Sequence, residues 1–171
     1  MEALFKPHTV PGSGAYANIL IGENVRNSDA AVMLWLTNNS FQGFFYSGAA
    51  RYTPEQAVVA DNWYHGAMHF KGSWNFAGFL NGEKTTNETI AATVNRNVNY
   101  WQIGNWQGVA NREFDGLIGE IRASSVLRSD AWIRATYHTL FGTLVSFDVL
   151  IVEAVPPTPG GGNLVSVFFI Y

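Results

Sequence analysis

The sequence contains no cysteine, and its charged residues are few. Without cysteine the 171-residue chain forms no disulfide bond, and thiol usage says nothing of its redox compartment. Asp, Glu, Lys and Arg make up 13% of the residues, about half the usual share near 25%. The net charge is -3, and the basic residues are scattered. We therefore expect no nucleic-acid partner, because no basic surface would neutralise phosphates.

Long hydrophobic runs are also absent. The most apolar stretch, 144–155, contains Asp148 and Glu153 and is too short for a membrane-spanning helix. The first residues lack the basic segment and apolar run of a secretory signal. We expect no membrane insertion and no export signal. The low charge leaves two ways to cover the surface: Asn, Ser, Thr and Gly solvate it, or other subunits bury part of it.

What the sequence does contain is a series of short apolar or alternating runs separated by Gly, Asn and Pro, a rhythm typical of an all-β sandwich. The length suits one domain with a sizeable core. The predicted strands are 18–21, 31–36, 42–46, 63–70, 74–80, 100–103 and 117–123.

Two of these strands carry further signals. Asn81-Gly82 favours a type I′ turn, so 74–80 and 83–91 should form a hairpin. Residues 63–70 are apolar at both odd and even positions, which predicts a central strand covered on both faces. Within this strand region we expect Trp63 to lie in the core, and likewise Trp74.

One short helix and an extended C-terminus complete the pattern. The helix should begin after Ser129 as N-cap and end at Gly142. We divide the chain into a β-sandwich (1–155), a Pro/Gly linker (156–163) and a final hydrophobic strand (164–171).

Several segments, in order, resemble the concanavalin A-like, laminin G-like jelly-roll family. Residues 114–124 (FDGLIGEIRAS) and 128–137 (RSDAWIRATY) are similar to its closing part. Upstream, 63–65 (WYH) resembles its Trp-His-His strand, 79–82 (FLNG) its Tyr-Val-Asp-Gly hairpin, and 103–104 its Ile-Gly strand.

This resemblance implies two antiparallel sheets packed face to face, a fold used for glycan binding, adhesion and, in some branches, glycan hydrolysis. Two departures argue against a calcium site borrowed from relatives: Gly119 stands where the family has an acidic residue, and Asn81 replaces its hairpin Asp. We expect no metal and no cofactor. Residues 4–7 resemble a strand that relatives precede with one or two others, so the N-terminal edge looks short of a strand.

The carboxylates do not complete a hydrolase motif. Hydrolytic relatives carry Glu-x-Asp-x-x-Glu, which supplies the paired carboxylates of glycoside hydrolysis. Here Glu113 and Asp115 begin the pattern, but the third position is Ile118, and Glu120 comes two residues late. We expect a protein that is not an enzyme, with glycan hydrolase as an outside alternative. His65 and His69 share one face of a strand, and we expect them to be packed or hydrogen-bonded rather than metal ligands.

The candidate ligand-binding residues are Trp101, Asn105 and Trp106, near a predicted strand end. Flat aromatic faces beside amides are what a sugar site uses for stacking and hydrogen bonding. Core packing of these aromatic side chains is the alternative.

The candidate assembly residues lie in the last segment, which has high β-propensity and no charge. Either this strand closes its own sandwich, in the place left by the short N-terminal edge, or it adds to the sheet of a neighbouring subunit. The residues concerned are Leu164, Val165, Val167, Phe168, Phe169 and Ile170.

The leading functional hypothesis is a non-catalytic structural or decoration module of a large assembly, such as a phage or other viral particle or a surface filament. Its expected location is a virion or cell-surface assembly, and its expected partner is itself or a larger protein assembly. The alternative is a stand-alone, lectin-like module that binds a glycan. The two roles are compatible in one protein.

Overall fold

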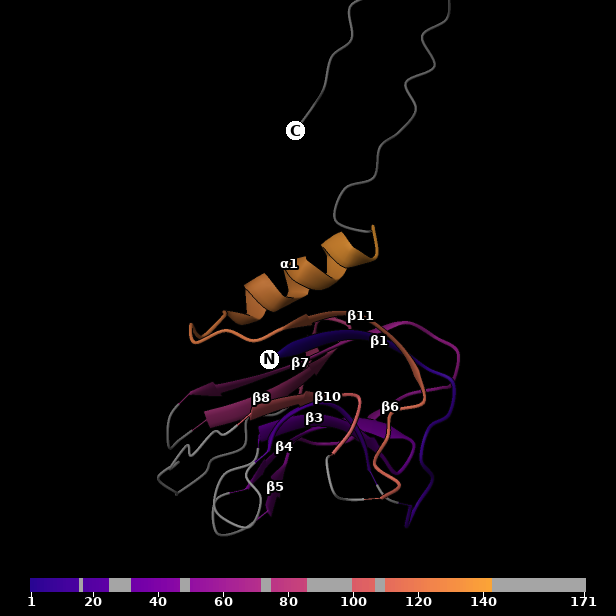
Figure 1. Cartoon of the computed structure of the whole chain (residues 1–171). Helices are drawn as coiled ribbons and strands as arrows, with labels where there is room; N and C mark the ends of the chain where they lie inside the picture. Colours follow the sequence, from indigo (N-terminus) through magenta and orange to yellow (C-terminus); the bar gives the residue numbers. More distant parts are fainter. Residues whose placement is uncertain are drawn as a thin grey trace, which may run out of the picture.

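The computed structural model describes residues 1–15, 17–24, 32–46, 50–71, 75–85, 100–106 and 110–142. Within these ranges the strands form two antiparallel sheets, and the single helix lies on the outside of one of them (Figure 1). This arrangement confirms the predicted all-β sandwich with one short helix. No helix in the described ranges is long and apolar enough to cross a membrane.

The sheet beneath the helix, sheet A, contains the N-terminal strand. Its strands, in spatial order, are β11 (Gly116–Arg122), β1 (Glu2–Pro7), β7 (Tyr64–Lys71), β8 (Asn75–Leu80) and β9 (Glu83–Lys84). The middle position of β7 agrees with the central strand predicted from its apolar residues. Asn81 (φ 52°) and Gly82 (φ 78°) join β8 to β9 with the positive φ angles of the predicted turn.

The second sheet, sheet B, is built mainly from the segment between β1 and β7. Its strands, in spatial order, are β10 (Tyr100–Ile103), β2 (Asn18–Asn24), β3 (Val32–Thr37), β4 (Ser40–Tyr46) and β5 (Ala50–Tyr52), and β6 (Gln56–Ala57) also pairs with β4. The register of β2 against β3 shifts between Ile19 and Ile21. Leu20 is therefore an extra residue on β2, and both Leu20 and Ile21 pack in the core.

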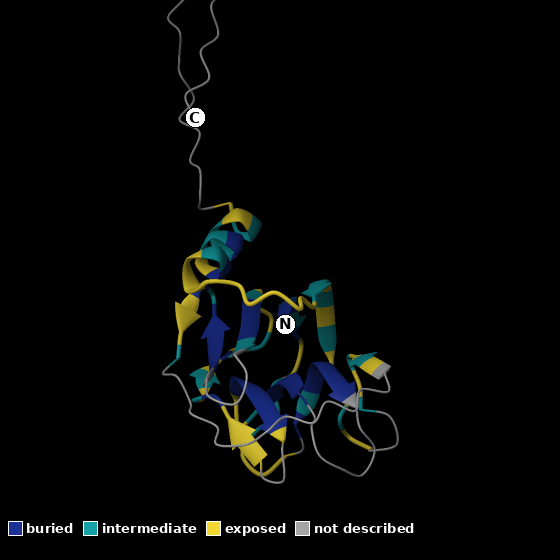
Figure 2. Ribbon diagram, turned by 90° about the vertical axis from the view of Figure 1, so that its left-hand side faces the viewer, coloured by how far each residue is buried: buried dark blue, intermediate teal, exposed yellow. Residues whose placement is uncertain are grey.

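The main core lies between the two sheets. Phe5 of β1 is fully buried there, and its ring centroid is 5.8 Å from that of Phe41 on β4 and 5.6 Å from that of Tyr64 on β7. Figure 2 shows that the strands carry most of the buried residues, whereas the helix exposes much of its surface. Strand alternation explains this core, because every second residue of each strand faces the opposite sheet.

The helix α1 (Asp130–Leu140) covers part of the outer face of sheet A (Figure 1). It begins where the sequence predicts, because Ser129 Oγ accepts a hydrogen bond from the Trp132 backbone N–H at 3.1 Å. Ile133 is buried against Ala67 of β7 and Phe79 of β8. The sheet is thus apolar on both faces where the helix lies.

The surroundings of β1 correct one expectation from the sequence. The N-terminal strand is not short of a neighbour, because it pairs with β11 on one side and β7 on the other. β11, the last described strand in the sequence, pairs with β1, the first. Local sequence does not reveal this long-range pairing. The predicted linker 156–163, the strand 164–171 and Trp74 lie outside the described residues.

Candidate functional site

The outer face of sheet B carries a cluster of aromatic side chains. The ring centroids of Trp35 and Phe44 are 4.6 Å apart, and Tyr52 lies 5.7 Å from Trp35 and 5.4 Å from Phe44. Tyr52 is 45% exposed and Tyr46 is 37% exposed, whereas Trp35 and Phe44 are each 7% exposed. We call Trp35, Phe44, Tyr46, Tyr52 and Trp106 the aromatic face.

Strand alternation places these rings on the side away from the core. Leu34 and Leu36 of β3 point into the core, so Trp35 between them points outward. Phe44 of β4 pairs directly with Tyr52 of β5, and paired residues of antiparallel strands share a face. Three adjacent strands therefore supply one continuous aromatic surface.

Trp106 extends this surface beyond β2. Its ring packs against the cluster that contains Ile19 and Trp35. The guanidinium carbon of Arg112 lies 5.4 Å from the Trp106 ring centroid, a cation–π distance. The backbone N–H of Ile19 donates to the Arg112 carbonyl at 3.1 Å, which ties this loop to β2.

The polar groups of the outer face are uncharged. None of the described strand residues on this face is acidic or basic. The strand register places the following residues on it: Ile19, Gly22, Met33, Trp35, Thr37, Ser40, Gln42, Phe44, Tyr46, Tyr52 and Gln102. Gln42 Nε2 donates to the Thr53 carbonyl at 3.0 Å. Trp35 Nε1 is buried, yet no described residue accepts its hydrogen bond. Leaving a buried donor unpaired costs roughly 1–3 kcal/mol.

This combination suits a sugar. Aromatic rings such as the exposed Tyr52 stack on the apolar C–H faces of a pyranose. A site with few charges binds hydroxyl groups without first having to desolvate ions.

The predicted ligand-binding residues do not all reach this surface. Trp106 belongs to the aromatic face, and Asn105 is exposed in the loop before it. Trp101 pairs with Glu23, whereas Gln102 pairs with Gly22 on the outer face, so Trp101 lies on the opposite side of β10. The role of these three residues in binding stays a prediction.

Sequence reasoning missed Trp35, Phe44 and Tyr52. The sequence did hold a signal for Trp35: it lies between Leu34 and Leu36, and strand alternation places it on the outer face if both leucines point into the core. Trp63 shows the opposite error: it was expected in the core but is 39% exposed. The reason is alternation, because Tyr64 packs inward against Phe5 and the preceding residue must therefore face outward.

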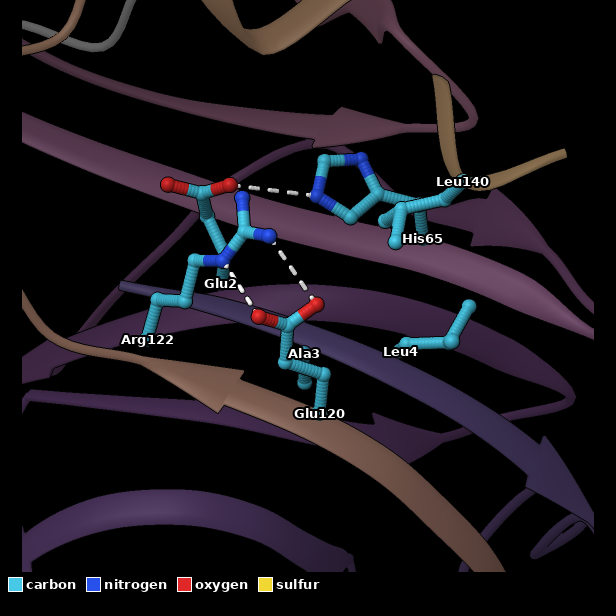
Figure 3. Close-up of a pocket in the computed structure, with 7 residues that line it drawn as sticks. All are labelled: Glu2, Ala3, Leu4, His65, Glu120, Arg122 and Leu140. Carbon is cyan, nitrogen blue, oxygen red and sulfur yellow. Dashed lines mark hydrogen bonds and ion pairs between the residues drawn. The ribbon is translucent and has the colours of Figure 1, made fainter. Parts of the chain in front are cut away.

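A cluster of charged side chains lies on the outer face of sheet A (Figure 3). His65 Nε2 is 3.3 Å from Glu2 Oε2, and both side chains are buried. Beside them, Arg122 Nε and Nη2 donate to the two oxygens of Glu120 at 2.7 and 3.0 Å. The cavity between these groups and Leu140 has a volume of about 10 Å³, close to the minimum for one water molecule and too small for a sugar.

The carboxylates of the incomplete hydrolase motif differ in their surroundings. Glu120 is held by Arg122 on β11. Glu113 and Asp115 are exposed and precede that strand. The described residues contain no group of three His, Asp or Glu side chains arranged to hold a metal ion.

His69 sits under the start of α1. Its Nδ1 lies 3.8 Å from Asp130 Oδ1, and Lys84 Nζ binds the other oxygen of that carboxylate at 2.7 Å. Burial lowers the pKa of His69 below its usual value, and nearby Lys84 lowers it further, while Asp130 opposes both effects. His65 and His69 share a face of β7, as the sequence predicts, but each faces a different carboxylate.

Comparison with known proteins assigns the family. A family model of the concanavalin A-like lectin/glucanases superfamily matches residues 1–134. The chain belongs to this superfamily. No curated protein sequence matches it significantly.

Solved structures with the same fold include sugar-binding proteins. The carbohydrate-binding module, CBM40, of the Ruminococcus gnavus IT-sialidase has a TM-score of 0.60 at 18% identity, with 80% of each chain covered. The same module has also been solved with α2,3-sialyllactose. A Bacteroides ovatus protein, provisionally described as carbohydrate-binding, gives a TM-score of 0.60 at 18% identity, over 78% of this superfamily member and 38% of the B. ovatus chain.

A larger enzyme also matches over part of its length. The Trypanosoma rangeli sialidase has a TM-score of 0.63 at 12% identity, with 82% of this chain covered but only 22% of the sialidase. At these identities the likeness concerns the fold. These four structures are described as carbohydrate-binding proteins or a sialidase, and none of the four is described as a particle component.

Proposed function

We propose that this superfamily member is a non-catalytic, glycan-binding module whose site is the aromatic face of sheet B. The observation that carries the proposal is Tyr52, which is 45% exposed and stacks on Trp35 on a surface whose described strand residues carry no charge. A saccharide stacked on the tyrosine would bring hydroxyl oxygens to this edge of the sheet.

Two further features support this location. The outer face of sheet A is partly covered by α1, whereas the aromatic face keeps two tyrosines accessible. The reported neighbours of the same fold include a module solved with a sialylated sugar.

The absence of catalysis is part of the proposal. Its support is that Glu120, the carboxylate nearest to completing the hydrolase pattern, forms a bidentate ion pair with Arg122 on the other sheet. Incubation of the protein with sialyllactose and a panel of neutral oligosaccharides should release no monosaccharide. Hydrolysis of any of these sugars would contradict it.

The binding site is tested with a glycan array that includes sialyllactose and lactose, followed by titration calorimetry on each hit. Tyr52→Ala should weaken binding at least about fivefold, since loss of one stacking ring costs on the order of 1–3 kcal/mol and each 1.4 kcal/mol is about tenfold in affinity. Tyr52 is half-exposed, so the variant should fold.

Trp101→Ala is the matched control, because Trp101 is similarly exposed but lies on the other side of β10. It should leave the affinity unchanged. If Trp101→Ala abolishes binding and Tyr52→Ala does not, the site lies elsewhere; if no glycan binds, the proposed function is wrong.

A further inference from the structure

A second exposed apolar surface lies on the outer face of sheet A. Trp63 is 39% exposed and Leu117 is 49% exposed, and both adjoin residues of β1. Lys6 pairs with Leu117 in the register of β1 and β11, so their side chains share this face. We call Leu4, Lys6, Trp63, Leu117 and Gly119 the Trp63 patch.

A bulge in β11 lies within this patch. Leu4 pairs with Glu120 and Phe5 with Ile118, which leaves Gly119 as the extra residue. A Cβ atom on Gly119 would lie 3.4 Å from Trp63 Cζ3 and 3.0 Å from Leu4 Cδ2. The indole therefore reaches from the start of β7 across β1 to the backbone of β11, over an extra residue that has no side chain.

The patch carries one positive charge. Lys6 makes no ion pair with any other described residue. An occupant with an apolar face and negative charge would therefore match the patch in both hydrophobicity and charge.

The end of α1 leads to this surface. Leu140, in its last turn, lines the same small cavity as Leu4 (Figure 3). Residues 143–171 lie outside the described ranges, and position 144 is four residues after Leu140. Four residues span at most about 14 Å, so the segment that starts there is tethered close to the patch.

The sequence of that segment has the required chemistry. In an extended conformation, residues 144–151 present Val145, Phe147, Val149 and Ile151 on one side, a wholly apolar face. The other side carries Asp148. Residues 143–171 contain Asp148 and Glu153 and no Lys or Arg, so the tethered segment is acidic where the patch is basic.

We propose that the segment 144–151 docks through its apolar face onto the Trp63 patch of the same chain. The segment buries Trp63 and Leu117 and brings negative charge near Lys6. Docking closes the outer face of sheet A beyond the area that α1 covers, and it leaves the aromatic face of sheet B open.

The absence of cysteine allows a clean cross-linking test in the full chain. Leu117→Cys is introduced together with Val145→Cys, Phe147→Cys or Val149→Cys, one pair per variant, because a disulfide needs Cα atoms about 4.4–6.8 Å apart. Under mild oxidation at low protein concentration, at least one pair should form an intramolecular disulfide, seen by mass and by migration on a non-reducing gel.

Ile103→Cys, paired with the same three positions, is the control, because Ile103 is 59% exposed on β10 of sheet B. A Leu117 pair should cross-link at least about tenfold faster than its Ile103 counterpart, owing to the higher effective concentration of a docked segment. Equal rates in both sets, no cross-link in any Leu117 pair, or a disulfide-linked dimer would overturn the proposal. The dimer would identify a second copy as the occupant.

Discussion

The outer faces of the two sheets differ in both chemistry and cover. On the outer face of sheet A, α1 packs on Phe79, and beside it lie the buried Glu2–His65 pair and the Glu120–Arg122 ion pair. On the outer face of sheet B the described strand residues carry no charge, and Tyr52 and Tyr46 keep part of their rings exposed. Both sheets share one core, so the core does not explain the difference.

The comparison separates two uses of a sheet surface. On sheet A the outward residues hold a structural element in place, and their loss should lower the free energy of unfolding. On sheet B the outward rings pack on one another and remain partly accessible, so their loss should affect a ligand more than the fold. The predictions below test this division, in order of decreasing effect on stability.

The largest effect is expected under the helix. Phe79→Ala should lower the free energy of unfolding by about 3–5 kcal/mol, because the ring is fully buried between β8 and α1 and leaves a cavity. Urea denaturation followed by circular dichroism measures the loss. Tyr52→Ala, on the exposed face of sheet B, is the matched comparison and should cost below about 1 kcal/mol. Equal losses would break the contrast between the two faces.

The buried Glu2–His65 pair should have the next largest effect. Glu2→Ala should cost about 1–3 kcal/mol, because it removes the partner of His65 Nε2 within a buried site. The same denaturation experiment reports it. Glu55→Ala, which removes an exposed carboxylate hydrogen-bonded to Asn38, should change stability by less than about 0.5 kcal/mol. A Glu2 variant as stable as the wild type would show that the pair is not structural.

Helix capping should contribute less. Ser129→Ala should cost about 1 kcal/mol, because the Trp132 N–H loses its side-chain acceptor at the start of α1. A shift of the urea midpoint measures this, with the exposed Ser13→Ala as control. If both serine variants behave alike, the cap does not stabilise the docked helix.

The smallest effect is a dependence on pH. Burial lowers the pKa of His69, so below its usual value near 6.5 the unfolded chain binds more protons than the folded one. Stability should therefore fall as the pH drops below about 6.5 and hold above it. His69→Gln should reduce the loss of stability between pH 7.5 and 5.0, compared by urea midpoints. If His69→Gln loses as much stability between pH 7.5 and 5.0 as the wild type, the pH dependence arises from the other histidines or from carboxylates.

The features predicted well from sequence are those set by a few neighbouring residues. Asn81-Gly82 forms its turn because the two residues tolerate positive φ, and Ser129 caps α1 because its hydroxyl meets a backbone N–H three residues on. Family motifs added the two-sheet arrangement, which the observed strand pairing confirms. Trp63 was placed wrongly because its exposure depends on which side of β7 meets the other sheet.

The candidate site depended on strand pairing. Trp106 was singled out from its residue type, but its partners Trp35, Phe44 and Tyr52 come from strands distant from it in sequence. Bulges at Leu20 and Gly119 also shift which residues face outward, and nothing local marks them.

The sequence alone determined the class of this protein: an all-β sandwich with one capped helix, no disulfide bond and few charges. Those properties follow from composition, alternation and turn chemistry, which act over a few residues. Only the tertiary structure decided which outer face carries the helix, which carries the rings, and that β11 fills the place beside β1. These choices depend on long-range pairing, in which a single extra residue moves a side chain from one face of a sheet to the other.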